Sequence, residues 1–360
     1  MKTAKTSLIK FLRILSHTGL LLLLTFMCTY PVRASQFESI KKKEINKNFS
    51  VSKNDLLQVD NRYGNITISS WNKKEVAIQV EIEAKAHSDQ KAQAILDRIH
   101  IQLEKNGGTV SAITSIASDN SDGSEQSFTI NYSINMPAEL ACHLTQKYGN
   151  IRMPETNKGK CDLHAKYGNI HGGNFSAPLN IDIKYGNLEI ANTTDELMIV
   201  CKYGNLTMGK VSEMNTDIKY GNIQIEELGH GVIKQKYGNS TIQKVKKGIA
   251  INELGYSKFH INELASDFTQ ISAEARYSTL NIKTDKKSSF KVKADNMKYG
   301  NCKIKGFNVS HQSQKFDTSD FDSKKIKKDN DDYDLLVNSG KGGQILFNGN
   351  KYSNLDITAE

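Results

Sequence analysis

Residues 179–190 read Leu-Asn-Ile-Asp-Ile-Lys-Tyr-Gly-Asn-Leu-Glu-Ile, and the central Lys-Tyr-Gly-Asn recurs along the chain. Identical copies begin at Lys147, Lys166, Lys184, Lys202, Lys219, Lys236 and Lys298, and altered copies begin at Arg62, Gly255, Arg276 and Lys351. Successive tyrosines from Tyr148 to Tyr299 are 19, 18, 18, 17, 17, 19, 21 and 22 residues apart. A period this short indicates one supersecondary unit stacked on copies of itself.

The residues around each tyrosine alternate between apolar and polar. In the copy at Tyr185, Leu179 and Ile181 precede the tyrosine by six and four residues, whereas Leu188 and Ile190 follow it by three and five. Period-two alternation is typical of half-buried strands. The apolar positions change parity across the motif, so the chain must break register there. We expect the glycine to make this break by adopting a positive φ, which Gly and, less readily, Asn tolerate.

One repeat is therefore predicted to be a strand, a tight corner, a second strand and a looser corner. We expect an all-β fold in which parallel coils of about 17–22 residues stack as a β-solenoid. A propeller would need blades of about 40 residues, and leucine-rich repeats have a different consensus.

Residues 1–34 have the pattern of a secretory signal peptide, with a basic start, an apolar run at residues 20–27 and the small-x-small sequence Val32-Arg33-Ala34. The apolar run is short for a membrane span, and the residues before Cys28 do not fit a lipidation site. We expect cleavage before Ser35 and export to the periplasm, outer surface or extracellular space, with no transmembrane span remaining.

Removing residues 1–34 takes away five basic and no acidic residues, which lowers the formal net charge from +9 to +4. The mature chain is only mildly basic, so its charge does not indicate nucleic-acid binding.

Residues 35–136 lack the regular repeat and are predicted to form an N-terminal β-rich cap, since an open solenoid end exposes strand edges. Strands are expected at residues 56–61, 66–71, 76–86, 99–104, 110–116 and 128–135, and a short helix at residues 88–98, with Ser88 as its N-cap.

Residues 137–307 are assigned to the solenoid, and residues 308–360 to a polar loop and a closing coil. Residues 311–334 are rich in Asp, Lys and Ser, which predicts an exposed or partly disordered loop. Leu346 and Tyr352 return to the repeat register and predict a last coil packed back on the stack.

These motifs resemble the bacterial putative-adhesin domain family, whose members are exported domains of unknown function. The similarity lies in residues 57–59, in Arg62-Tyr-Gly-Asn and the following residues through Trp71, in the helix after residues 76–86 and in the Tyr-Gly-Asn coils. It also includes the hairpin at residues 340–343, which is followed by Lys351-Tyr-Ser-Asn354. The resemblance covers most of the mature chain and implies a right-handed parallel β-solenoid at the cell surface. It brings no catalytic residues with it.

Four cysteines remain after signal cleavage: Cys142, Cys161, Cys201 and Cys302. Their spacing fits no zinc or redox motif. Cys142 and Cys161 hold the same inward position on neighbouring coils and should stack, either as small buried apolar residues or as a disulfide in an oxidising compartment.

A β-helix enzyme acting on carbohydrate would need two facing carboxylates, or a metal held by carboxylates. The outward acids Asp162, Asp182, Glu189 and Asp217 share no position on adjacent coils, and the nearest approach to a site is His164 beside Asp162. Residues 329–334 lack the central Gly and terminal Glu of a calcium loop. We therefore assign no catalytic residue, cofactor or metal.

The repeated outward chemistry is the lysine before each tyrosine. This lysine strip comprises Lys147, Lys166, Lys184, Lys202, Lys219 and Lys236. In one interpretation the lysine stems cover the tyrosines, and Asp182 and Asp217 offset the charge. In the other, the strip binds an anionic glycan or another envelope polymer.

The sequence thus predicts a non-enzymatic, exported adhesion, binding or scaffold module. The alternatives are a carbohydrate-active enzyme of the β-helix type and a regulatory protein of the cell envelope. The pattern indicates no particular oligomeric state.

Overall fold

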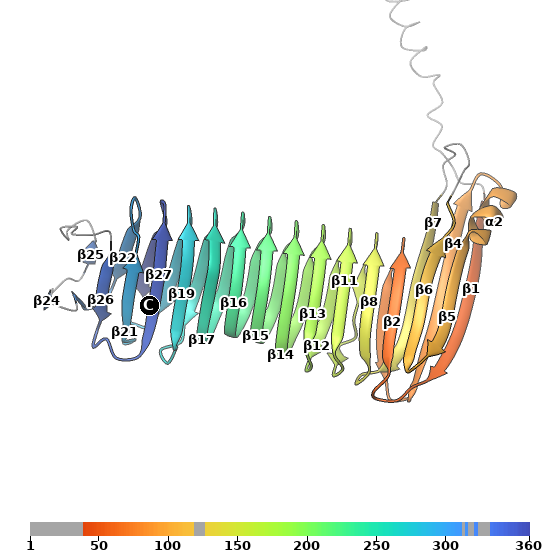
Figure 1. Ribbon diagram of the computed structural model, residues 1–360, viewed down its shortest axis with the longest axis horizontal. Helices are drawn as coiled ribbons and strands as arrows, with labels where there is room; N and C mark the ends of the chain where they lie inside the picture. The colour runs from red at the N-terminus through yellow and green to blue at the C-terminus, as the bar shows by residue number, and fades with distance from the viewer. Residues whose placement is uncertain (1–38, 119–126, 312–313, 316–319, 323–331) are drawn as a thin grey trace, which may run out of the picture.

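The computed structural model describes residues 39–118, 127–311, 314–315, 320–322 and 332–360, so the predicted signal peptide lies outside the described residues. Most of them form strands of one large sheet that is not closed into a barrel, and the one helix described is α2 (Asp89–Asp97). The strands stand as rungs along a single long axis (Figure 1). The all-β prediction is confirmed, whereas the solenoid and its handedness remain predictions.

The repeats pair in parallel, with each motif residue opposite its counterpart in the next repeat. Lys166, for example, lies opposite both Lys147 and Lys184. Strands that end at the motif are β2 (Leu56–Arg62), β8 (Ala141–Lys147), β11 (Cys161–Lys166), β13 (Leu179–Lys184) and β19 (Gln270–Arg276). Strands after a motif are β3 (Ile66–Trp71), β9 (Ile151–Arg152), β10 (Thr156–Asn157), β12 (Ile170–Phe175), β18 (Lys258–Leu264) and β20 (Thr279–Thr284). Four long strands serve both roles: β14 (Leu188–Lys202), β15 (Leu206–Lys219), β16 (Ile223–Lys236) and β17 (Asn239–Gly255).

The predicted inward positions form one continuous core. In β13 the residues alternate between buried and half-buried, with Leu179 and Ile181 inside, and Leu188 and Ile190 of β14 are buried on the other side of the corner. Each inward row contacts the rows above and below it, so burial depends on neighbouring coils.

The residue with a φ near 60° at each corner is the tyrosine. The glycine has a positive φ at Gly64 and Gly149, where values of 158° and 156° lie close to the extended region, and at the other corners the predicted positive φ of the glycine was wrong. Tyr185 and Tyr203 have φ of 57° and 59°, and the equivalent tyrosines of the other repeats lie in the same left-handed region. The glycine is required for a different reason. A Cβ on Gly186 would lie 1.8 Å from the carbonyl oxygen of Gly168, and a Cβ on Gly204 would lie 1.8 Å from that of Gly186. The corners pack too closely for any side chain at this position.

The asparagine after each glycine links its coil to the next. Its side-chain Oδ1 accepts a hydrogen bond from the backbone N–H of the following asparagine, at 2.8–3.1 Å in each step. This asparagine ladder comprises Asn65, Asn150, Asn169, Asn187, Asn205, Asn222 and Asn239. Asparagine is thus selected by a hydrogen bond between coils rather than by tolerance of positive φ.

The N-terminal region closes one end of the stack with antiparallel strands. They are β1 (Ser39–Ser50), β4 (Glu75–Ala86), β5 (Ile99–Asn106), β6 (Thr109–Ile116) and β7 (Ser127–Pro137). Helix α2 packs against β1 and β4, and Ser88 Oγ accepts from the Lys91 N–H at its start, as predicted. The segment at residues 56–71, which the sequence analysis assigned to the cap, pairs through β2 and β3 with β8 and β9 as one more repeat.

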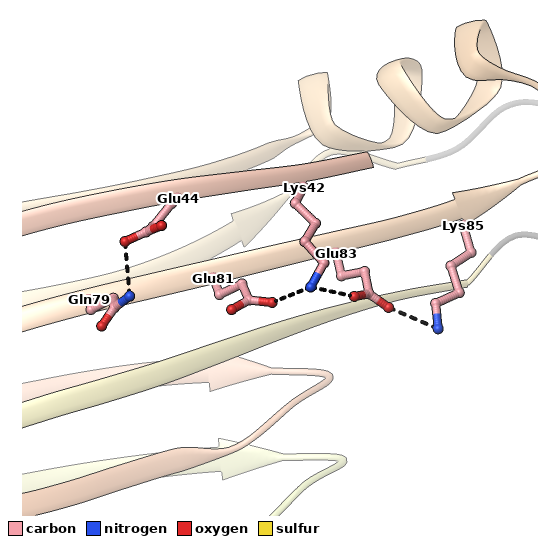
Figure 2. Close-up of polar contacts among 6 residues, drawn as sticks. All are labelled: Lys42, Glu44, Gln79, Glu81, Glu83 and Lys85. Carbon is pink, nitrogen blue, oxygen red and sulfur yellow. Dashed lines mark hydrogen bonds and ion pairs between the residues drawn. The ribbon is translucent and has the colours of Figure 1, made fainter. Parts of the chain in front are cut away.

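The sequence analysis did not predict strand β1. It pairs along its length with β4, and among the described residues this is its one strand partner. Lys42 of β1 lies between Glu81 and Glu83 of β4, at 3.0 and 3.1 Å, and Glu44 accepts from Gln79 (Figure 2). Hydrogen bonds to the two glutamates raise the pKa of Lys42. A lysine-rich outer strand is a common protection against edge-to-edge association.

The C-terminal coil is inserted into the stack instead of ending it. Strand β27 (Gly343–Asn350) lies between β19 and β21 (Phe290–Asp295), and β28 (Asn354–Ala359) lies between β20 and β22 (Asn301–Lys305). The coil of Tyr299 is therefore beyond that of Tyr352, although it precedes it in sequence. Strand β23 (Val309–His311) leads into the predicted loop, which holds the short strands β24 (Gln314–Lys315) and β25 (Asp320–Asp322), and β26 (Tyr333–Val337) begins at its end.

The stacking of Cys142 and Cys161 is confirmed, and both are buried free thiols with their Sγ atoms 3.4 Å apart. The hydrogen bond to Cys161, together with burial, holds the pKa of Cys142 well above its ordinary value. In this structure Cys142 and Cys161 therefore pack as two free thiols within the core.

Candidate functional site

The tyrosines of all the repeats form one exposed column along the stack. In spatial order this tyrosine column comprises Tyr63, Tyr148, Tyr167, Tyr185, Tyr203, Tyr220, Tyr237, Tyr256, Tyr277, Tyr352 and Tyr299. Neighbouring ring centroids are 4.9–5.2 Å apart from Tyr63 to Tyr277, and the ring planes differ by at most 16° over that range. The rings are 39–63% exposed.

Stacking decides which part of each ring a ligand can reach. A ring such as Tyr203 has Tyr185 on one face and Tyr220 on the other, both at 4.9 Å. Its exposed surface is therefore its edge. Within the described part of the chain, no hydroxyl of the column has a hydrogen-bond partner on the protein. The column can offer hydroxyl groups to a ligand, but not the ring faces on which sugars and bases stack.

The lysine strip lies directly beside the tyrosine column. All six predicted lysines point outward in register, and Arg62 lies opposite Lys147 as the equivalent residue of the first repeat. The ammonium groups of Lys147 and Lys166 lie 5.0 and 5.2 Å from the centres of the Tyr148 and Tyr167 rings. These two match the interpretation in which lysines cover tyrosines.

The other four lysines divide into two pairs. Lys184 contacts Asp182 at 3.4 Å, as predicted, and Lys236 contacts Glu253 at 2.6 Å. Among the described contacts, Lys202 and Lys219 have neither an acidic nor an aromatic partner, so Asp217 does not offset Lys219 as expected. The centre of the strip therefore carries two unpaired ammonium groups on adjacent strands.

A groove of about 930 Å³ runs over the strands that follow the tyrosines. It exists because small residues, Gly172, Ala191 and Gly209, line its floor, while Arg152, His171, Glu189, Thr207, Gln224, Glu226 and Gln243 supply polar groups. Glu189 and Glu226 belong to coils two apart and are offset by two residues along the strands, because Gln224 is the residue in register with Glu189, so their backbones are roughly 12 Å apart. This exceeds the separations of about 5–9.5 Å between the carboxyl groups of glycosidases, which the enzyme alternative would favour.

The third surface feature is a cluster of His143, Asp162 and His164. Only His164 and Asp162 were paired from the sequence. His143 on β8 and His164 on β11 both contact Asp162, with His143 Nδ1 3.0 Å from Oδ2 and His164 Nε2 3.0 Å from Oδ1. The predicted His164–Asp162 pair is present, and His143 joins it because Asp162 lies directly opposite His143 in the parallel register. Of the segment weighed as a calcium loop, residues 329–334, the first half at 329–331 lies outside the described residues.

No helix of the described residues combines the length and apolar character needed to cross a membrane.

Comparison with known proteins gives matches to solved structures alone. No family model matches the chain, and no curated protein matches it. One similar structure is described as a putative adhesin from Parabacteroides merdae, with 9% identity over 67% of this chain and 93% of the other, and a TM-score of 0.39. Another is a putative adhesin from Bacteroides fragilis, with 11% identity over 88% and 98% of the two chains and a TM-score of 0.33.

A third similar structure is described as a putative lipid binding protein from Parabacteroides distasonis, with 10% identity over 67% of this chain and 94% of the other, and a TM-score of 0.32. The description "adhesin" coincides with the family that the sequence resembles. Identities near 10% and TM-scores below 0.5 are too low to assign a ligand or a role to this chain. Its function must be inferred from its own residues.

Proposed function

We propose that this chain is an exported, non-enzymatic β-solenoid that acts as an adhesion or binding module of the cell surface or periplasm. In this proposal the signal peptide at residues 1–34 directs export, residues 35–136 form a cap joined to one more repeat at residues 56–71, residues 137–307 form right-handed parallel coils, and residues 308–360 supply the coil inserted near the far end. The ligand is a linear anionic polymer, such as a sulfated or uronic-acid glycan, held by the tyrosine column and the lysine strip.

The observation that carries the proposal is the unpaired centre of the lysine strip. Lys202 and Lys219 lie opposite each other on adjacent parallel strands. Two positive charges about 4.8 Å apart repel by roughly 1 kcal/mol even in water. Neither ammonium group covers a tyrosine ring, so the interpretation in which the lysines cover the tyrosines does not account for these two residues. An anionic ligand would offset both charges.

The geometry of the column selects the type of ligand. Because the ring faces are covered, binding would use phenol hydroxyls and ammonium groups, which suit sulfate and carboxylate groups. The sites repeat every 4.9 Å over several coils, so a flexible polymer can contact several at once. Weak individual contacts then add through effective concentration.

The test is binding of heparin and of polygalacturonate to the purified chain. Binding at low salt should weaken strongly near physiological ionic strength, where charges are screened over about 8 Å. Changing Lys184, Lys202 and Lys219 together to Gln should lower the affinity between about threefold and about 150-fold, since three exposed ion pairs contribute roughly 0.2–1 kcal/mol each.

The matched control removes the same charge from the cap. Lys43, Lys53 and Lys74 are exposed and lie away from the strip, and changing them together to Gln should leave the affinity nearly unchanged. Equal losses in the two triple variants would reduce the interaction to net charge and reject the lysine strip as a site. Failure of the native chain to bind either polymer at low salt would reject the proposed ligand class.

A further inference from the structure

We propose that His143, Asp162 and His164 bind one divalent transition-metal ion, with zinc as the representative ion. This metal site is independent of the tyrosine column and the lysine strip, and of the ligand proposed for them. The three residues lie on the outward face of β8 and β11 and are all half-buried.

The spacing of the donor atoms suits such an ion. Asp162 contacts each imidazole at 3.0 Å, and one donor atom of each residue lies within 4.8 Å of the others. Zinc binds histidine nitrogen and carboxylate oxygen at about 2.0–2.2 Å, so two donors around a tetrahedral ion are roughly 3.4 Å apart. The two separations between Asp162 and the imidazoles would each lengthen by roughly 0.4 Å, and the separation between the two imidazole nitrogens, at most 4.8 Å, would adjust to the same value.

The sheet limits which groups can join the site. Cys142 and Cys161 are the sequence neighbours of His143 and Asp162, but strand alternation buries both thiols on the opposite face. The donor set is therefore two imidazoles and one carboxylate, which suits zinc and similar ions and leaves a coordination position open. A hollow of about 290 Å³, lined in part by Asp162, His164 and Asp182, adjoins this position and has room for water or a ligand group.

Charge near the site also favours a cation. Asp182 lies directly opposite His164 on β13, and its Oδ1 is shielded from solvent without a hydrogen-bond partner. The other oxygen of Asp182 contacts Lys184 at 3.4 Å. The nearest lysines of the same strands, Lys147 and Lys166, hold their ammonium groups over tyrosine rings.

A second histidine–carboxylate pair shows what the cluster adds. His171 contacts Glu189 at 3.2 Å, and no third group that could hold a metal completes that pair among the described residues. In the proposed site, one carboxylate is shared by two imidazoles from adjacent strands. The pair of His171 and Glu189 therefore serves as the matched control.

The experiment is calorimetric titration of the metal-free chain with Zn²⁺, with Ca²⁺ titrated separately. We expect one saturable zinc site per chain and no calcium binding there, because calcium requires six to eight oxygen ligands. Co²⁺ should bind with visible absorption bands of a low-coordinate nitrogen and oxygen site. Loss of outer-shell partners alone costs metal sites about 10–100-fold in affinity, so His143→Ala, His164→Ala and Asp162→Asn should each lose at least about tenfold.

The variant His171→Ala should retain the native zinc affinity. Circular dichroism should show unchanged β structure in all four variants, since the substituted side chains are on the surface. The proposal is overturned if the native chain shows no saturable zinc binding. It is also overturned if folded His164→Ala binds as tightly as the native chain, or if His171→Ala loses as much affinity as His164→Ala.

Discussion

Two kinds of corner hold the same tyrosine column. In the coils from Tyr63 to Tyr237 the tyrosine is followed by Gly-Asn, whereas in the coils of Tyr256, Tyr277 and Tyr352 it is followed by serine. Both kinds place the tyrosine at positive φ, 57–60° in the first group and 48–52° in the second. Their hydrogen bonds between coils differ.

The direction of the side-chain hydrogen bonds reverses between the two groups. In the glycine coils, the asparagine of one coil accepts from the backbone N–H of the coil that follows it in sequence. In the serine coils, Oγ of Ser257 and of Ser278 accepts from the preceding coil, from the N–H of Gly238 at 3.4 Å and of Ser257 at 3.1 Å. Each hydroxyl also donates to the carbonyl oxygen two residues earlier, of Gly255 and Arg276. The tyrosine conformation can therefore be supported from either side of the corner, which identifies the tyrosine as the common element.

The largest expected difference concerns the residue after the tyrosine. Gly204→Ala places a Cβ 1.8 Å from the Gly186 carbonyl oxygen. Because backbone atoms cannot move aside locally, we expect a loss of about 3 kcal/mol, the upper part of the range for overpacking. Ser257→Ala removes a hydroxyl but adds no atom, and should cost about 1 kcal/mol. Thermal and urea unfolding followed by circular dichroism would compare the two, and equal losses would show that the close approach at Gly204 is relieved by backbone movement.

The repeat period and the period-two alternation were sufficient to predict the strands of the coils and their inward residues. The pattern did not predict which residue of the corner adopts a positive φ. Gly and Asn both tolerate a positive φ, whereas tyrosine adopts one rarely. Only the parallel register shows that the glycines approach one another and that the asparagines form a ladder. The register was also needed to bring His143 to Asp162 from a neighbouring strand.

The ends of the molecule were less predictable because their partners are distant in sequence. Strand β1 has few apolar residues, and its pairing with β4 supplies the structure that its own pattern does not indicate. The insertion of β27 and β28 between earlier coils cannot be predicted from the local sequence pattern. Leu346 and Tyr352 would keep the same repeat register wherever their coil was placed in the stack. The tyrosine column could have been predicted from the period alone, since in-register repeats must align identical residues about 4.8 Å apart.

A medium effect is expected from removing one ring of the tyrosine column. Tyr203→Ala loses two stacked neighbours at 4.9 Å, each worth about 0.5–1.5 kcal/mol, and keeps a non-glycine residue at positive φ. Tyr203→Gly loses the same ring but relieves about 1 kcal/mol of backbone strain, so it should be more stable than the alanine variant. Tyr277→Ala, whose neighbours are at 5.0 and 5.8 Å, should be less destabilised than Tyr203→Ala. A glycine variant no more stable than its alanine counterpart would contradict strain at the tyrosine.

The smallest effect should come from the asparagine ladder, because it is exposed and water can replace its bonds. Asn205 accepts from the Asn222 N–H at 3.1 Å and donates through Nδ2 to Asn187 Oδ1 at 3.2 Å. Asn222 Nδ2 also donates to Asn205 Oδ1, at 3.0 Å. Asn205→Ala removes all three bonds and should cost about 1 kcal/mol. Asn205→Asp keeps the acceptor for Asn222 but places a carboxylate oxygen beside Asn187 Oδ1, so part of the stability should return once that carboxylate is protonated. Unfolding midpoints measured at pH 7 and pH 3, each relative to the native chain, would test this: the deficit of Asn205→Asp should shrink at pH 3, while that of Asn205→Ala stays constant. Absence of a deficit for Asn205→Asp at both pH values would show that the donor half of the ladder contributes nothing, and that asparagine is present for its acceptor oxygen alone.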